Sequence, residues 1–162
     1  MGRGTGAQGS PFAGDSTYAL FARLVRVQTR LWNEVDAVLR SEHGTTLADV
    51  TPLQLVADLP ARRVQDIVDT LHITVGGASK VVDRLVAAGL VVRRTNPEDR
   101  RSAVLQVTAA GTALLARVKP DVDAVLDRHL GQVLSPTELA GLDRILTKLH
   151  HPHHHPGPQE EA

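Results

Sequence analysis

The chain has 162 residues, a mass of 17.4 kDa, no cysteine, and only 2 % aromatic residues. This length suits one domain that buries its core without disulfides or metals. The lack of cysteine excludes disulfide bonds, thiolate catalysis and thiol redox sensing. The scarcity of aromatic side chains disfavours a stacking surface for single-stranded nucleic acid. Because no apolar run reaches about 18 residues and the first residues, MGRGTGAQGSP, carry no secretion signal, we expect a cytoplasmic protein without a membrane span.

The formal net charge is zero, but the charges are unevenly distributed along the chain. Residues 1–61 carry a net charge of −1, residues 62–102 carry +3, and residues 103–162 carry −2. A basic middle segment between acidic flanks indicates one anion-binding face, which a homodimer would double. An ordinary solvated surface is the alternative that charge alone leaves open.

Two long amphipathic segments flank this basic middle. Apolar residues at spacings of three and four predict a helix from Thr17 to His43, a length typical of a dimerisation helix. A second long helix is predicted after a cap at Thr108, with Pro120 expected to kink it. Ser135-Pro136 predicts the start of the last helix.

The middle of the chain is predicted to hold short helices followed by a β-hairpin. In chain order we expect helices over 53–59, beginning at Thr51-Pro52, over 64–71 and over 75–88, and strands over 90–95 and 103–108. The turn His72-Ile73-Thr74 joins the helix over 64–71 to the helix over 75–88. This order defines a mostly α fold with a small β-hairpin wing: a winged helix-turn-helix with long flanking dimerisation helices.

A winged helix-turn-helix suits duplex DNA, because a helix fits the major groove and its exposed side chains reach base edges. Lys80 and Arg84 are four residues apart and share one helix face. Arg100 and Arg101, at the hairpin tip, can reach the adjacent minor groove. The alternative is a solvated turn at the tip and salt bridges on the helix surface.

The stretch from Leu71 to Gly111 resembles the MarR family (multiple antibiotic resistance regulators). The matching pieces are Asp83-Arg84-Leu85, Ala88-Gly89-Leu90-Val91, the run from Asn96 to Arg101, and Val107-Thr108 followed by Gly111. The resemblance implies a homodimer that binds a pseudo-palindromic double-stranded DNA operator and regulates transcription, as a repressor relieved by a small aromatic acid or phenol. In that dimer we expect Leu31, Leu126 and Leu146 to be mostly buried.

The resemblance also implies residue roles. The DNA-binding residues it suggests, with the neighbouring arginines, are Gly76, Gly77, Ser79, Lys80, Arg84, Arg93, Arg94, Arg100 and Arg101. Asp99 would hold the wing in shape by pairing with basic residues. Asp83 is expected to be structural, and either it or Asp69 is the alternative ion-pair partner of Lys80 and Arg84.

The implied ligand would wedge into a cleft between the helix at 53–59 and the helix that starts at Thr108. Trp32 could stack on an aromatic ligand, and Arg26 or Arg30 could neutralise its charge. Burial of Trp32 in the dimer core is the alternative.

The sequence has no carboxylate pair, Gly-rich phosphate loop, nucleophile elbow or HExxH pattern, so we expect no enzyme activity, catalytic residue, cofactor or dedicated metal site. His43 and His72, each at a helix end, are expected to be surface or capping groups. We organise the chain as an arm over 1–14, a domain over 15–150 whose DNA-binding lobe is 51–108, with dimerisation helices over 16–43 and 109–150, and a tail over 151–162. The arm and tail are expected to be disordered.

Histidines from His150 to His155 can bind divalent metals to some degree. They leave one alternative function open, a metal- or small-molecule-binding protein that keeps the winged-helix fold without specific DNA binding.

Overall fold

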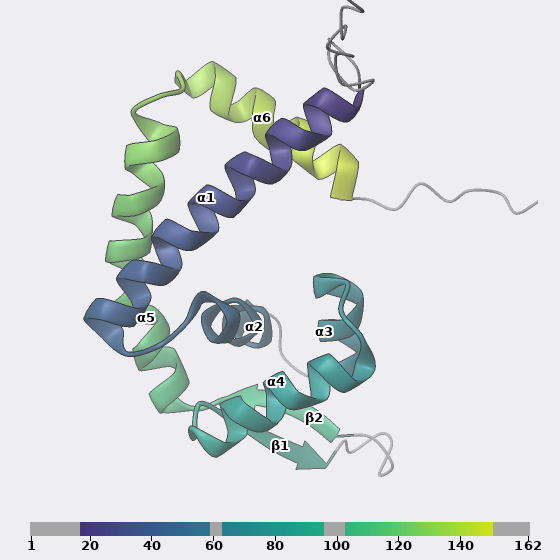
Figure 1. Cartoon of the computed structure of the whole chain (residues 1–162). Helices are drawn as coiled ribbons and strands as arrows, with labels where there is room; N and C mark the ends of the chain where they lie inside the picture. The colour runs from purple at the N-terminus through teal and green to yellow at the C-terminus, as the bar shows by residue number, and fades with distance from the viewer. Residues whose placement is uncertain (1–16, 59–62, 96–102, 151–162) are drawn as a thin grey trace, which may run out of the picture. The chain divides into compact units, whose positions relative to one another are not determined.

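The structure is a computed structural model that describes residues 17–58, 63–95 and 103–150 (Figure 1). Its elements are α1 (Thr17–His43), α2 (Leu47–Asp58), α3 (Val64–Leu71), α4 (Val75–Ala87), β1 (Val91–Thr95), β2 (Ala103–Val107), α5 (Ala109–Leu126), a π-helical turn η1 (Asp127–Gly131) and α6 (Pro136–His150). The chain divides between Asp123 and Ala124 into two compact units. The arm and the tail lie outside the described residues.

Helix α1 has the predicted bounds, and it ends where Gly44 adopts a positive φ of 61°. Glycine reaches this left-handed conformation without a steric penalty, which is why it ends helices so often. Val35 and Leu39, in the C-terminal half of α1, are buried in the first unit. The large apolar side chains in the N-terminal half of α1 are exposed.

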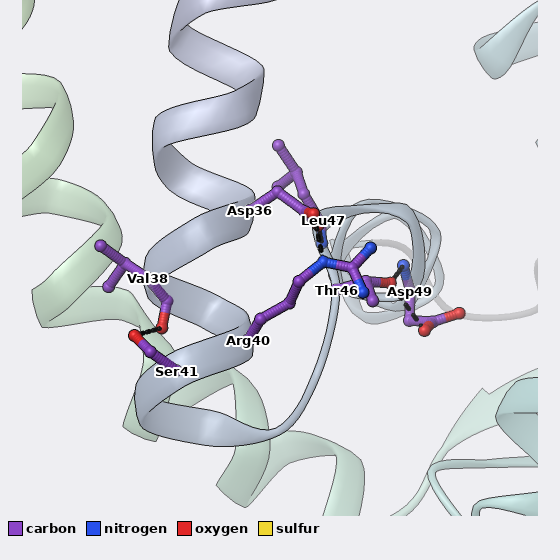
Figure 2. Close-up of polar contacts among 7 residues, drawn as sticks. All are labelled: Asp36, Val38, Arg40, Ser41, Thr46, Leu47 and Asp49. Atoms are coloured by element: carbon purple, nitrogen blue, oxygen red, sulfur yellow. Dashed lines mark hydrogen bonds and ion pairs between the residues drawn. The ribbon is translucent and has the colours of Figure 1, made fainter.

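Helix α2 begins six residues before the predicted start at Leu53, so that prediction was wrong. Thr46 caps it: the backbone N–H of Asp49 donates to the Thr46 hydroxyl at 3.2 Å, and that hydroxyl donates to Asp49 Oδ2 at 2.7 Å (Figure 2). This contact pair resembles a capping box. Pro52 lies inside the helix and removes one backbone donor, but it is fully buried, so packing offsets the loss.

Asp36 fixes the corner between α1 and α2. Its Oδ1 accepts from the Leu47 backbone N–H at 2.7 Å and its Oδ2 accepts from Arg40 Nε at 2.6 Å (Figure 2). The hydrogen bond from Arg40, and then that from Leu47, hold the pKa of Asp36 below its usual value of 3.8. The contact therefore stabilises the fold while Asp36 is ionised.

We expect Asp36→Ala to lower the free energy of unfolding by about 1–2 kcal/mol at pH 7, because two hydrogen bonds to a charged acceptor are lost. Because the pKa of Asp36 is lowered in the folded state, the full loss of stability relative to wild type is expected above the unfolded-state pKa of 3.8. The difference between the two proteins disappears as the pH falls through the folded-state pKa. Urea unfolding at several pH values measures it. Asp69→Ala, which removes an exposed carboxylate on α3, is the control, and an equal loss in both variants would contradict the role of Asp36.

The helix-turn-helix forms as predicted from local signals. Thr74 caps α4 by accepting the Gly77 backbone N–H at 3.1 Å, and His72 adopts the left-handed conformation with φ 51° after α3. Gly89, with φ 70°, follows the end of α4. The core side chains of these two helices are Ile67, Ala78, Val82 and Leu85.

The β-hairpin is the antiparallel pair β1–β2, in which Val91 pairs with Val107 and Thr95 with Ala103. Val91 and Leu105 are buried, and the hairpin contacts α2 and α4. Both strands match the predicted ones to within one residue. Residues 96–102, between the strands, lie outside the described part of the chain.

Thr108 links the hairpin to α5 and caps that helix, as predicted. Its hydroxyl accepts the Gly111 N–H at 3.1 Å and lies 2.7 Å from the Gly89 carbonyl oxygen. Gly111 is buried against Leu90, which lies between α4 and β1. A Cβ added at Gly111 would lie 2.3 Å from the Leu90 carbonyl oxygen. Pro120 lies inside α5, which continues to Leu126; the kink expected there stays a prediction.

The second unit contains the end of α5, η1 and α6. Ser135 and Glu138 cap α6, since the Ser135 N–H and hydroxyl both donate to Glu138 Oε2, at 2.8 and 2.7 Å. The hydrogen bond from the Ser135 hydroxyl has the larger effect, and that from the Ser135 backbone N–H the smaller, in lowering the pKa of Glu138. The start of α6 is as predicted. Among the described helices, none is both long and apolar enough for a membrane span.

Candidate nucleic-acid interface

Helix α4 has one anchored face and one open face. Ala78, Val82 and Leu85 are 0–1 % exposed, and they fix the orientation of the helix against the first unit. On the opposite side Lys80 and Arg84 are exposed. The burial pattern therefore presents the two predicted cations together on the outer surface.

The two glycines at the N-terminus of α4 differ in their exposure. Gly76 is exposed, and a Cβ there would meet no atom within 4 Å, so it leaves open space at this end of the helix. Gly77 is half-buried, and its N–H is already taken by the Thr74 cap. Ser79 is half-buried too, so of Gly76, Gly77 and Ser79 only Gly76 is openly accessible.

Arg84 is held by an acidic residue of another helix. Its Nη2 and Nε atoms lie 2.8 and 3.1 Å from Asp49 Oδ1 at the start of α2, and its side chain is 53 % exposed. The partner is thus neither Asp83 nor Asp69, the two residues expected as alternatives. Within the described residues Lys80 forms no ion pair.

The hairpin adds two more exposed cations next to α4. Arg93 Nη2 lies 2.9 Å from Asp83 Oδ1, so Asp83 joins α4 to β1, as its expected structural role requires. An exposed ion pair of this kind contributes about 0–1 kcal/mol, so Arg93 can exchange Asp83 for a phosphate at small cost. Arg94 is exposed. The positions of Asp99, Arg100 and Arg101 lie outside the described residues, and their roles stay predictions.

His43 differs from the surface or capping group that was expected. Its side chain is 7 % exposed, and its Nε2 lies 2.8 Å from Asp121 Oδ2 on α5. The contact joins the C-terminal end of α1 to α5. His72 is exposed and follows the end of α3, as expected.

A cleft of about 740 Å³ lies between α2, α3 and α5, within the first unit. Its surface is mostly apolar, with Val50, Leu55, Leu115 and Val122 among the lining residues. Polar groups come from Thr51, Gln54, Thr70 and Thr112, and charged groups from Asp58, Lys119 and Asp123, of which Lys119 and Asp123 lie 2.5 Å apart. The location is the one predicted for a ligand.

The predicted ligand residues are not brought to this cleft. Arg26 and Arg30 line a separate shallow groove along α1, where Arg30 Nε lies 2.9 Å from Glu34 Oε1. Trp32 is 38 % exposed and lines neither hollow. In the described part of the chain, no three histidine, aspartate or glutamate residues are grouped to hold a metal ion.

A basic recognition helix beside a two-stranded wing is the architecture of winged helix-turn-helix transcriptional regulators. A family model described as "MarR family" matches residues 43–102. The HTH-type transcriptional regulator MhqR of Bacillus subtilis is 30 % identical over 108 residues, which cover 67 % of this chain and 74 % of MhqR. The multiple antibiotic resistance protein MarR of Escherichia coli is 32 % identical over 79 residues, covering 49 % of this chain and 55 % of that protein.

Solved structures give the same result. The transcriptional repressor CouR, bound to a 23-mer DNA duplex, has a TM-score of 0.72 and 30 % identity to this chain, with 80 % of this chain and 91 % of CouR covered. The chain belongs to the MarR family. It is a DNA-binding transcriptional regulator, as the resemblance implied, and its family is non-enzymatic.

Proposed function

We propose that the protein acts as a homodimeric repressor, which binds a pseudo-palindromic DNA site through α4 and the β1–β2 hairpin. The observation that carries this proposal is the two-sided α4: a fully buried inner face and an outer face with Lys80 and Arg84. Arg93 and Arg94 extend the same cationic set onto β1. A dimer bound to promoter DNA would prevent other proteins from binding the same DNA, which is how it would repress transcription. CouR, a relative of known structure, is likewise a transcriptional repressor.

Exposed apolar side chains support a second copy as the partner. On α1, Leu20 and Phe21 are 61 and 58 % exposed, and on α6 Leu149 is 67 % exposed. Monomeric soluble proteins seldom leave large apolar patches open, and each of these two helices by itself has several exposed apolar side chains. Leu146 is exposed in the single chain, while Leu31 and Leu126 are half-buried. We expect all three to be covered only when two copies meet.

The cleft between α2, α3 and α5 is the proposed ligand site. Two recognition helices must lie about 34 Å apart to occupy successive turns of one DNA face. A ligand that binds better to a dimer whose recognition helices lie at a different separation shifts the population toward that dimer. The DNA is then released. The apolar lining suits an aromatic ring, and the threonine and glutamine groups suit a phenolic hydroxyl. Lys119 is the one cation among the described lining residues, which favours a phenol over a strongly acidic ligand.

Fluorescence anisotropy with DNA from upstream of the protein's own gene tests the DNA-binding proposal. We expect tight binding to this DNA, much weaker binding to a scrambled duplex, and a linear fall of log Kobs with log salt between about 50 and 200 mM, because bound phosphates release counterions. Arg84→Ala is expected to cost about 1–3 kcal/mol of binding free energy and to relax preference at one base pair of each half-site. Equal affinity for both duplexes would contradict specific recognition.

A salicylate or phenol titration tests the ligand proposal. We expect saturable binding to the free protein and release of the DNA complex, with the midpoint of thermal unfolding raised by the ligand. Ala116→Trp, which narrows the cleft, is expected to bind DNA normally but to resist release, whereas Trp32→Ala is expected to respond as wild type does. If zinc released the DNA and no aromatic acid or phenol did so at millimolar concentration, the histidines would be the sensor and this proposal would be wrong.

A further inference from the structure

The ion pair between Asp49 and Arg84 joins the start of α2 to the outer face of α4. Both donating atoms, Nη2 and Nε, reach the same carboxylate oxygen, Asp49 Oδ1. A guanidinium has five N–H donors in a fixed planar fork. Two of them, one on Nε and one on Nη2, are taken by Asp49, which leaves one on Nη2 and two on Nη1. The Arg84 side chain is 53 % exposed, so the ion pair does not bury it.

Asp49 is itself held in place. Its second oxygen, Oδ2, accepts from the Thr46 hydroxyl at 2.7 Å (Figure 2). Both carboxylate oxygens therefore have a partner. The next residue after Thr46 is tied to α1 through the bond from Leu47 N–H to Asp36. The carboxylate that binds Arg84 is therefore part of the ordered corner between α1 and α2 and not a free surface group.

We propose that Asp49 is a positioning residue, which aims the free edge of Arg84 at a guanine in the major groove; this rests on the proposed role of α4 in DNA binding. Arginine recognises guanine through two N–H groups that donate to O6 and N7. The edge formed by Nη1 and Nη2 still has the donors that this needs. A side chain that is already ordered also loses less conformational freedom when it binds.

The opposite role, in which Asp49 withholds Arg84 from DNA, makes a different prediction. In that case removal of the carboxylate would free Arg84 and tighten binding to the operator. For a positioning role, removal leaves the charge of Arg84 near the DNA but loses the orientation. Base discrimination then falls, while the salt dependence that counts phosphate contacts stays the same.

The test compares Asp49→Asn with Asp69→Asn, in the full chain, on an operator panel in which each guanine is replaced in turn. Asp69 is an exposed carboxylate of α3, and its substitution changes the net charge equally without touching Arg84. We expect Asp49→Asn to lose about tenfold in discrimination at one position per half-site, the same position that Arg84→Ala loses, with an unchanged salt slope. Asp69→Asn is expected to keep the wild-type discrimination at that position. Combining Asp49→Asn with Arg84→Ala is expected to add nothing to Arg84→Ala alone.

Wild-type discrimination by Asp49→Asn, or tighter operator binding, would overturn the positioning role. If Arg84→Ala itself kept full affinity and discrimination, the proposed contact of α4 with DNA would fail instead, which is a separate result. Asp49→Glu keeps the charge and the capping acceptor but moves them by one methylene. It is expected to lose part of the discrimination at the same position, and it provides the test if Asp49→Asn melts too low to assay.

Discussion

Leu24→Glu is expected to convert the protein to monomers and to weaken operator binding by about a hundredfold or more. Leu24 is 45 % exposed on α1, next to the exposed Phe21, in the surface proposed to meet a second copy. A carboxylate there would be buried without a partner, and a two-fold interface contains the substitution twice. A monomer contacts one half-site only, so the gain from two linked contacts is lost.

Sedimentation velocity at micromolar concentration and anisotropy with operator DNA measure this effect. Ala57→Glu is the matched control, because it adds the same charge at an exposed position of α2, outside the proposed dimer helices. We expect this control to stay dimeric. A wild-type protein that sediments as a monomer, or a Leu24→Glu variant that stays dimeric, would contradict the proposed interface.

Gly111→Ala is expected to lower the free energy of unfolding by about 3 kcal/mol. Its Cβ would lie 2.3 Å from the Leu90 carbonyl oxygen and 2.7 Å from Val107 Cγ2. The first of these is backbone, which accepts the Thr108 N–H at 3.0 Å, so it cannot move without breaking the junction of hairpin and α5. Overpacking of this kind costs about 1–3 kcal/mol and occasionally more.

Gly76→Ala is the control for that substitution. An added Cβ at Gly76 meets no atom within 4 Å, so alanine should be neutral or stabilise α4 by up to about 1 kcal/mol through its higher helix propensity. Urea unfolding of both variants gives the comparison. If Gly111→Ala were as stable as Gly76→Ala, the close approach of α5 to Leu90 would not exist in solution.

Elements with local signals could be predicted from the sequence. The cap at Thr74, the positive φ of Gly89 and the Ser135–Glu138 pair each lie within a few residues of the helix end that they fix. The start of α2 could not be placed, because two capping patterns compete there. Thr46 with Asp49 forms the cap, and the stronger pattern at Thr51-Pro52 lies inside the helix.

The site was predictable only in part, for a similar reason. Periodicity correctly placed Lys80 and Arg84 on the exposed face of α4, since that face lies opposite the buried residues of the same helix. The partner of Arg84 lies 35 residues earlier in the sequence, and that of His43 lies 78 residues later, so packing alone brings them together. Trp32, Arg26 and Arg30 have the chemistry of ligand contacts. The cleft itself is lined by residues of α2, α3 and α5, which come from separate parts of the chain, so no local pattern identifies them together.

Methylation interference at guanine N7 tests most directly whether α4 reads the major groove. We expect methylation to block wild-type binding at guanines in two clusters, related by symmetry and about one helical turn apart. For Arg84→Ala, interference should disappear at one guanine in each cluster and persist at the others, because that arginine contacts N7. Binding that no guanine methylation affects, or the same interference pattern in both proteins, would contradict recognition through Arg84 of α4.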